Sequence, residues 1–181
     1  MPLRSFVLGK ARLADVLDDD ARTNLARSMA DRVVAAAGDR DLAIVTSAPE
    51  VCEWAAARGL TVLEDPGSLD GAAAAGQAWA AAHGHARYAI VHADLPRATS
   101  LDAITGDGGN AIAVVVPDHR NDGTPVLSLP TGSPFTFQYG PGSAARHIAE
   151  AEVRGLQVRV VHDPDLAFDV DLPADLEALA P

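Results

Sequence analysis

Short hydrophobic segments alternate with helical patterns along most of the chain. Four hydrophobic runs predict buried strands, at 42–47, 60–65, 88–96 and 111–118. Shorter extended segments read PVLSLP and FTFQYG, and a later one, LQVRVVHD, alternates apolar and polar residues. Strands separated by helices are typical of an α/β fold with a mainly parallel sheet flanked by helices. We find no repeat or linker, so we expect residues 1–181 to form a single domain.

Helical patterns lie between these runs. Leu25, Met29 and Val33 recur every four residues, which places them on one face of a helix. An alanine-rich stretch at 71–82 predicts a second helix. Near the end of the chain, DVDLPADLEAL passes from a strand into a helix, with Pro173 close to the helix start.

The segment after the first of the four runs carries start and stop signals of a helix. Ser47 and Glu50 have the spacing of a capping box, and Pro49 occupies an early helical position. Gly59 marks the end of the segment. We therefore expect a helix that begins with a side-chain cap.

Composition and charge narrow the classes of partner. Hydrophobic residues make up 48% of the chain and aromatic residues only 4%, which suits helices packed closely on a sheet. The net charge of −11 argues against nucleic acid and anionic membranes as partners, so an anionic ligand needs a local cluster of positive charge. The single cysteine, Cys52, excludes an intrachain disulfide. No apolar run approaches the ~20 residues of a membrane span and no signal peptide is evident, so we expect a cytoplasmic location.

Charged residues follow several predicted strands, at the sheet edge where α/β proteins bind ligands. Lys10 and Arg12 follow the first extended segment, with Arg4 just upstream. An ammonium beside a guanidinium suits a triphosphate, although a short basic turn exposed to solvent has the same spacing.

Acidic residues follow two other strands. Asp94, in HADLP, comes directly after a hydrophobic run, and Asp169 and Asp171 would share one side of a strand in DVD. Neighbouring carboxylates repel each other unless a cation or a proton lies between them, and Mg²⁺ prefers such oxygen ligands together with phosphates. A turn cap at Asp94 and a solvated edge at DVD are the alternatives.

The segment FQYGPGSAARH joins a glycine-rich turn to a predicted helix. Glycine lets backbone N–H groups approach a ligand, and Ser143 has the position of a helix N-cap, the end that favours anions. Upstream, PDHRNDGT supplies Asp118, Asp122 and Thr124. An ordinary capped helix and a plain turn are the alternatives at these two places.

Together these segments resemble the phosphoenolpyruvate or 2-phospho-L-lactate guanylyltransferase family of deazaflavin coenzyme biosynthesis. The resemblance covers roughly residues 2 to 179 and rests on GKARL, HADLP, NDGT, YGPGSAARH and DVDLPADL, in that order. ADLP and DxDxP recur across the nucleotidyltransferase superfamily, whereas YGPGSAARH is the segment that singles out this family. The implied fold is a Rossmann-like nucleotidyltransferase domain, here with its first strand almost absent.

The resemblance implies transfer of GMP from GTP to a small phospho-acid, with release of pyrophosphate. It places the nucleotide near Arg4, Lys10, Arg12, Thr46 and Asp70.

It also assigns the residues of the metal and the acceptor. Asp94 and Asp171 would hold Mg²⁺, with Asp169 in reserve, and the acceptor would bind at Thr124, Gly140 and Ser143. Lys10, Arg12, Asp94 and Asp171 would form the catalytic set.

Two other functions fit the same pattern. One is a molybdopterin or sugar-phosphate nucleotidyltransferase, and the other is a module that senses nucleotide or phosphate without catalysis. Phosphoenolpyruvate, 2-phospho-L-lactate and 3-phospho-D-glycerate all present a carboxylate beside a phosphate ester, so the pattern does not choose among them. It allows a homodimer.

Overall fold

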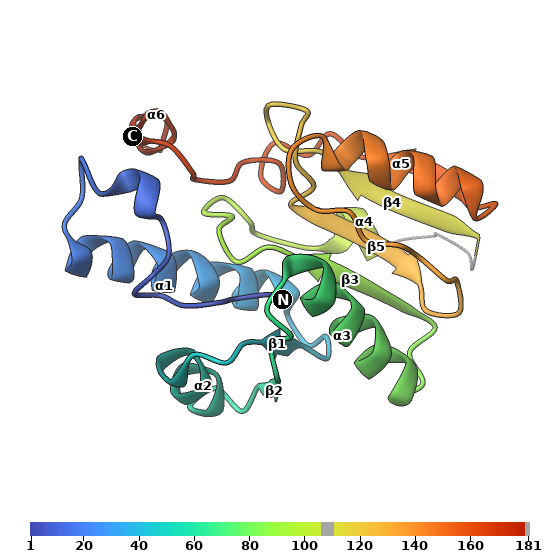
Figure 1. Ribbon diagram of the computed structural model, residues 1–181, viewed down its shortest axis with the longest axis horizontal. Helices are drawn as coiled ribbons and strands as arrows, with labels where there is room; N and C mark the ends of the chain where they lie inside the picture. The colour runs from blue at the N-terminus through green and yellow to red at the C-terminus, as the bar shows by residue number, and fades with distance from the viewer. Residues whose placement is uncertain (106–110, 180–181) are drawn as a thin grey trace.

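The computed structural model describes residues 1–105 and 111–179 and has an α/β architecture (Figure 1). The strands are β1 (Ala43–Val45), β2 (Thr61–Leu63), β3 (Arg87–Val91), β4 (Ile112–Val116), β5 (Val126–Pro130) and β6 (Gln157–Val160). The helices are η1, a 3-10 helix (Ala11–Leu13), α1 (Asp19–Ala37), α2 (Pro49–Ala56), α3 (Leu69–Ala82), α4 (Asp102–Thr105), α5 (Ser143–Val153) and α6 (Pro173–Glu177). In the described part of the chain, no helix is long and apolar enough to cross a membrane.

The strands form two sheets. β1 and β2 are parallel, and the other four strands have the order β3-β5-β4-β6. β5 is antiparallel to both neighbours, while β4 and β6 are parallel. β3, β4 and β6 therefore run in one direction, and the predicted, mainly parallel α/β arrangement is confirmed with one reversed strand.

Two of the expected extended segments are not strands. FTFQYG runs without strand pairing from the end of β5 toward α5, and Asp169–Asp171 is a loop before α6. The backbone N–H of Val170 donates to the carbonyl of Asp94 at 3.3 Å, a single contact in place of a ladder. The two carboxylates of DVD are thus placed by a loop rather than by strand alternation.

The start of the chain contributes only a bridge beside β1. Pro2 pairs with Val45 in parallel, with the bonds Leu3 N–H to Val45 carbonyl and Val45 N–H to Met1 carbonyl both at 3.0 Å. The expectation of a much shortened first strand agrees with this pairing.

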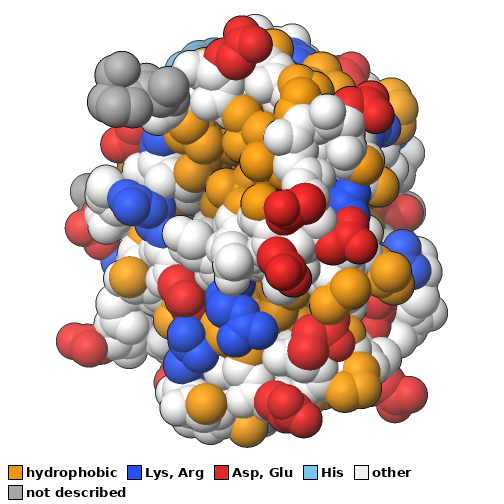
Figure 2. All heavy atoms as spheres, turned by 90° about the vertical axis from the view of Figure 1, so that its left-hand side faces the viewer, with side chains coloured by type: hydrophobic (Ala, Val, Ile, Leu, Met, Phe, Trp, Pro, Cys, Tyr) orange, Lys and Arg blue, Asp and Glu red, His pale blue; other side chains and the backbone are white. Residues whose placement is uncertain are grey.

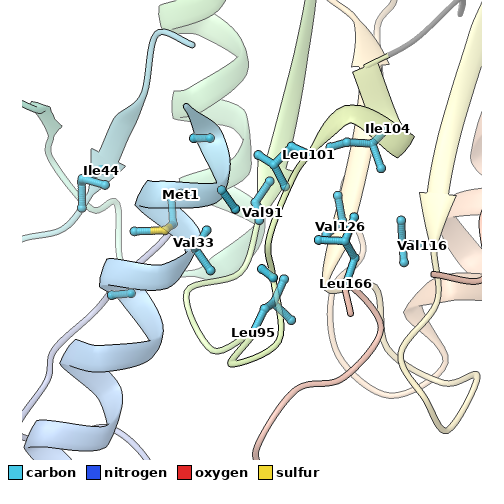
Figure 3. Close-up of a cluster of buried hydrophobic side chains, with 14 of the residues drawn as sticks. Met1, Val33, Ile44, Val91, Leu95, Leu101, Ile104, Val116, Val126 and Leu166 are labelled. Atoms are coloured by element: carbon cyan, nitrogen blue, oxygen red, sulfur yellow. The ribbon is translucent and has the colours of Figure 1, made fainter. Parts of the chain in front are cut away.

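The main hydrophobic core joins both sheets to α1 (Figure 3). Ile44 of β1, Val33 of α1, and Val91, Val116 and Val126 of the larger sheet are all nearly or fully buried. Alanine, valine, isoleucine and leucine make up most of this layer, and Phe6 and Trp54 are its aromatic members. The core therefore fixes the ends of β1 and β3 relative to each other, and with them the loops that carry the site.

Two predicted caps differ in the structure. The residue before α2 is Ala48, whose methyl side chain cannot accept a hydrogen bond, and the Ser47 hydroxyl accepts from the Asp65 N–H at 3.2 Å rather than from α2. The expected capping box is therefore wrong. At α5 the N-cap is Gly142, with φ 72°, and Ser143 is the first helical residue instead of the cap.

Candidate functional site

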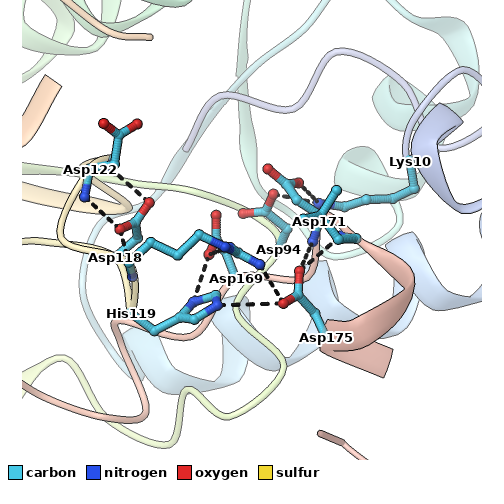
Figure 4. A network of polar contacts seen from close by, with 11 residues as sticks. Lys10, Asp94, Asp118, His119, Asp122, Asp169, Asp171 and Asp175 are labelled. Carbon is cyan, nitrogen blue, oxygen red and sulfur yellow. Dashed lines mark hydrogen bonds and ion pairs between the residues drawn. The ribbon is translucent and has the colours of Figure 1, made fainter. Parts of the chain in front are cut away.

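Three residues far apart in the sequence meet at one point of the fold (Figure 4). The Nζ atom of Lys10 lies 2.6 Å from Oδ2 of Asp94 and 3.0 Å from Oδ1 of Asp171. Lys10 directly precedes η1, Asp94 follows β3 and Asp171 precedes α6. Lys10 has φ 56° and ψ 36°, a conformation that costs a non-glycine residue roughly 1–2 kcal/mol. The double ion pair helps to hold it there.

The charges of this cluster stabilise one another. Burial disfavours the charge of Lys10, but the two carboxylates outweigh that effect and raise its pKa. Burial also disfavours the charge of Asp94, and the Lys10 ammonium outweighs it and lowers the pKa of Asp94. Both groups are therefore charged near neutral pH. The other carboxylate oxygen of Asp94, Oδ1, is buried and has no hydrogen-bond partner within the described residues.

Asp169 faces a different set of neighbours from Asp171. Its Oδ1 lies 3.2 Å from Nδ1 of His119 and 3.7 Å from a guanidinium nitrogen of Arg120, distances of ion pairing without hydrogen-bond alignment. Burial, followed by the charges of Asp94 and its other acidic neighbours, raises the pKa of Asp169 to about 6. A carboxylate in this position gains from any further cation.

A cavity of about 1000 Å³ opens beside Lys10 and Asp94. Its walls come from the segment before η1, from the start of α2 and from the end of β3, and they include Arg4 and Glu50. The Arg4 side chain is 75% exposed and its guanidinium lies 3.7 Å from Asp65. This size and this wall suit a nucleotide with its phosphates directed toward Lys10.

Other residues predicted to contact the nucleotide lie outside this wall. Arg12 is exposed on η1, and Thr46 is 2% exposed, its hydroxyl accepting from the Ala48 N–H at 3.2 Å. Asp70 lies on α3 and accepts a hydrogen bond from the Tyr139 N–H at 2.7 Å. Asp70 therefore links α3 to the glycine-rich turn, and Thr46 stabilises the turn that leads into α2.

The glycine-rich turn lies at the start of α5. Gly140 and Gly142 have φ of 109° and 72°, in the left-handed region that favours glycine. Thr124 and Ser143 are each 1% exposed, with their hydroxyl oxygens 3.0 Å apart, and the Ser143 N–H donates to the Gly140 carbonyl at 3.0 Å. The structure therefore brings the three predicted acceptor residues together, with the two hydroxyls buried.

Protein groups already engage much of the turn. The Gly142 N–H donates to Oδ1 of Asp122 at 2.9 Å, and the Ala144 N–H donates to the Asp122 carbonyl at 3.0 Å. The Arg146 guanidinium donates to the carbonyls of Gln138 and Pro141. The turn is thus held from the side of the 118–124 loop and from α5 itself.

A buried carboxylate connects that loop to the segment of Asp171. Asp175, 4% exposed, accepts the N–H groups of Asp171 and Leu172 on Oδ2, at 2.9 and 2.8 Å. Its Oδ1 accepts from Arg120 at 2.5 Å. Asp118 closes the loop by accepting the N–H of Gly123 at 2.8 Å.

Divalent metal fits part of this cluster. Among residues 1–105 and 111–179, no three His, Cys, Asp or Glu side chains form a group that could hold a metal ion by themselves. Two carboxylates do converge, however, and one buried oxygen of Asp94 has no hydrogen-bond partner among the described residues. Mg²⁺ commonly takes one or two carboxylates and completes its shell with water and substrate phosphates, so this donor set suits it when a nucleotide is bound.

Comparison with known proteins identifies the family of this chain. Residues 1–180 match the family described as "Guanylyl transferase CofC like". The chain belongs to this family. It is 37% identical over 187 residues to the phosphoenolpyruvate guanylyltransferase of Sphaerobacter thermophilus, covering 99% of this chain and 90% of that protein. It is 34% identical over 191 residues to the 3-phospho-D-glycerate guanylyltransferase of Phenylobacterium zucineum, covering 99% and 88%.

A solved structure gives the same answer for the fold. A nucleotidyl transferase from Methanothermobacter superposes with a TM-score of 0.67 at 14% identity, over 98% of this chain and 94% of that one. The expected nucleotidyltransferase fold is confirmed, and family membership makes the chain a guanylyltransferase-type enzyme.

Several residues of the site escaped the sequence analysis. Arg120 and Asp175 are far apart in the sequence and form an ion pair only in the folded protein, so no local sequence pattern predicts the pair. Asp175 had one usable signal, because it stands three residues after Leu172, at the position where a carboxylate can bond back to a helix start. His147 also had a usable signal, because its position four residues after Ser143 places both side chains on the same face of the predicted helix.

Proposed function

We propose that this enzyme transfers GMP from GTP to a small phospho-acid, with phosphoenolpyruvate as the first candidate acceptor. The observation that carries the proposal is the convergence of Lys10, Asp94 and Asp171 beside a nucleotide-sized cavity. The names of the similar proteins support a phospho-acid acceptor and include both phosphoenolpyruvate and 3-phospho-D-glycerate enzymes. The product would be a precursor in coenzyme biosynthesis, as the family resemblance implies.

In the proposed reaction a phosphate oxygen of the acceptor attacks the α-phosphorus of GTP. One P–O bond forms to the acceptor, the bond between the α- and β-phosphates breaks, and pyrophosphate leaves with the electron pair. The acceptor phosphate is already ionised near neutral pH, so the reaction needs charge compensation and alignment more than a protein base.

The residues divide this work. Asp94 and Asp171 would hold Mg²⁺, which would supply charge neutralisation at the phosphates. Lys10 would place a compact positive charge on the triphosphate, and exposed Arg4 and Arg12 would add guanidinium contacts at the edge. Asp169, whose charge interacts with those of Asp94 and Asp171, would be the reserve ligand.

The acceptor would bind against the glycine-rich turn. Its carboxylate or phosphate would lie at the start of α5, where the helix dipole favours an anion. We assign Gly140 to the backbone contact and Thr124 and Ser143 to the floor beneath it. Thr46 would act on the nucleotide side by holding the turn before α2, and Asp70 would join the start of α3 to the glycine-rich turn, between the two substrates.

An acceptor panel tests this function. The protein is incubated with GTP, Mg²⁺ and, in turn, phosphoenolpyruvate, 2-phospho-L-lactate, 3-phospho-D-glycerate or a sugar phosphate, with GTP binding, pyrophosphate release and product mass as readouts. We expect one guanylylated phospho-acid. GTP binding without pyrophosphate release from any acceptor would point to a sensing module, and turnover only with a sugar phosphate would point to the sugar-phosphate alternative.

A further inference from the structure

His147 is a buried imidazole with no role in the site described so far. It lies one helical turn after Ser143 on α5, is 0% exposed, and packs edge-on against Tyr139 with ring centroids 4.7 Å apart. Both ring nitrogens have partners. Nε2 lies 3.0 Å from the backbone nitrogen of Gln138, and Nδ1 lies 3.1 Å from Oγ1 of Thr124.

The backbone partner decides which ring nitrogen carries the proton. The Gln138 N–H can only donate, so Nε2 of His147 must accept, and a neutral imidazole then has its proton on Nδ1. Burial lowers the pKa of His147 to about 4, which keeps the ring neutral near pH 7. Nδ1–H therefore donates to the hydroxyl of Thr124.

Thr124 is the second side chain in a row of hydrogen bonds that runs from His147 to Ser143. Its hydroxyl accepts from His147, and its remaining described side-chain partner is Oγ of Ser143, 3.0 Å away. If Thr124 donates to Ser143, each hydrogen bond of this row has its donor. The hydroxyl proton of Ser143 is then the one that has no acceptor among the three side chains. Ser143 is the first residue of α5, so this proton lies at the helix end that favours an anion.

We propose that His147 is a positioning residue of the acceptor site, which orders the hydroxyls of Thr124 and Ser143 so that their protons point toward the turn. The inference rests on the proposed function. His147 touches no substrate and acts through Thr124. The aligned N–H and O–H dipoles would add to the helix dipole of α5 and favour the anionic group of the acceptor over water.

Two variants separate this role from simple packing, because each preserves the hydrogen bond of a different ring nitrogen of His147. The amide nitrogen of His147→Asn can take the place of Nδ1 and still donate to Thr124. The longer His147→Gln can reach the place of Nε2 and keep the Gln138 contact. We expect His147→Gln to raise the KM for the acceptor by about tenfold with the KM for GTP unchanged, and His147→Asn to retain more of the acceptor affinity.

The opposite ranking would overturn the proposal, since it would show that His147 serves to hold Gln138. His162→Gln, an exposed histidine, is the matched control. Ser143→Ala should also raise the acceptor KM, and an unchanged value would overturn the assigned direction of the chain.

A second measurement needs no turnover. Nitrogen-15 NMR of the unliganded protein should show the imidazole of His147, assigned by its loss in His147→Gln, with a proton on Nδ1 and none on Nε2. The reverse tautomer would overturn the inference. Absence of turnover with every acceptor would overturn the proposed function and the acceptor role of His147, whereas the NMR result would still decide the direction of the hydrogen bonds.

Discussion

Lys10 lies between the carboxylates of Asp94 and Asp171, where the family resemblance implies a metal ion. Its two proposed roles, at the carboxylates and at the triphosphate, therefore compete for one ammonium. The segment before it packs loosely, with Val7 54% and Leu8 83% exposed, so a shift of Lys10 toward a nucleotide disturbs little apolar contact. Binding of Mg²⁺ with GTP would release Lys10 to the phosphates.

Replacing Lys10 tests this competition. Lys10→Met keeps the length of the side chain and removes its charge, so turnover with GTP should fall by about 100-fold or more. Without nucleotide, the same variant should bind Mn²⁺ more tightly than the wild type, because the competing ammonium is gone. Calorimetric titration with Mn²⁺ measures this, and equal affinity in both proteins would show that Lys10 does not compete for the metal site.

The two carboxylates give a separate prediction at the same scale. Asp94→Asn and Asp171→Asn should each abolish turnover and raise the Mg²⁺ concentration that any residual activity needs, because each removes a charged ligand. Asp15→Asn, an exposed acid, is the control. Both variants should remain folded by circular dichroism. Wild-type Mg²⁺ dependence in both would remove the shared metal from the mechanism.

At the scale of elements, the 118–124 loop connects the two halves of the site. Asp122 holds the turn before α5, and Arg120 reaches Asp175, which in turn holds the N–H of Asp171. Gly123 allows this tight loop, because a Cβ there would lie 2.6 Å from the Asp118 carboxylate. The glycine-rich turn and the segment of Asp171 are thus braced by one loop.

Asp175→Asn tests this brace. The amide keeps the shape of the side chain but loses the charge that pairs with Arg120, which should cost on the order of 1–3 kcal/mol of stability. We also expect a higher Mg²⁺ requirement for turnover of the folded enzyme, because Asp171 is less firmly placed. Thermal unfolding and Mg²⁺ activation curves separate the two effects. A lower melting temperature with an unchanged Mg²⁺ curve would limit Asp175 to stability.

The elements also show how far sequence patterns reach. Hydrophobic periodicity predicted the α/β order because each run had to be buried, and β1 to β4 confirm it. The reversal of β5 was open to prediction, since only residues 117–125 separate it from β4 and a parallel crossover needs about a dozen or more. The predicted cap at Ser47 is wrong, because the Ser47 hydroxyl accepts a hydrogen bond from the backbone N–H of Asp65, a residue distant in sequence.

The site divides in the same way. Residues next to strand ends, such as Asp94, could be predicted because the fold class sends strand ends to one edge. The pairing of Lys10 with both carboxylates and the chain from His147 to Ser143 depend on side-chain directions across segments remote in sequence. No local pattern encodes those directions.

At the scale of the whole molecule, the proposed function requires a chain of net charge −11 to bind a polyanionic nucleotide. Acidic and basic side chains are interspersed around a hydrophobic area on the face shown in Figure 2. The negative charge that repels an anionic ligand is therefore not confined to one patch of this face. Under the proposed function, local cations and Mg²⁺ would therefore have to offset the overall repulsion. The pH dependence of stability should report the same excess of negative charge.

Asp169 gives the clearest case. Its pKa is about 6 in the folded protein and near 3.8 when unfolded, so between these values the folded state binds more protons. Its favourable contribution is thus complete below about pH 4 and is lost as the pH rises through 6. Above pH 6 the charged, buried carboxylate should cost on the order of 2–3 kcal/mol relative to its protonated form.

Asp169→Asn should therefore be more stable than the wild type at pH 7.5 in a chelating buffer, with the difference shrinking toward pH 4.5. Added Mg²⁺ with GTP should narrow the gap at pH 7.5, because a cation relieves the wild-type carboxylates and gains less in the variant. Urea unfolding at the two pH values, with and without Mg²⁺ and GTP, measures both effects. A variant less stable at pH 7.5 would mean that the ion pairs of Asp169 outweigh the repulsion from its acidic neighbours.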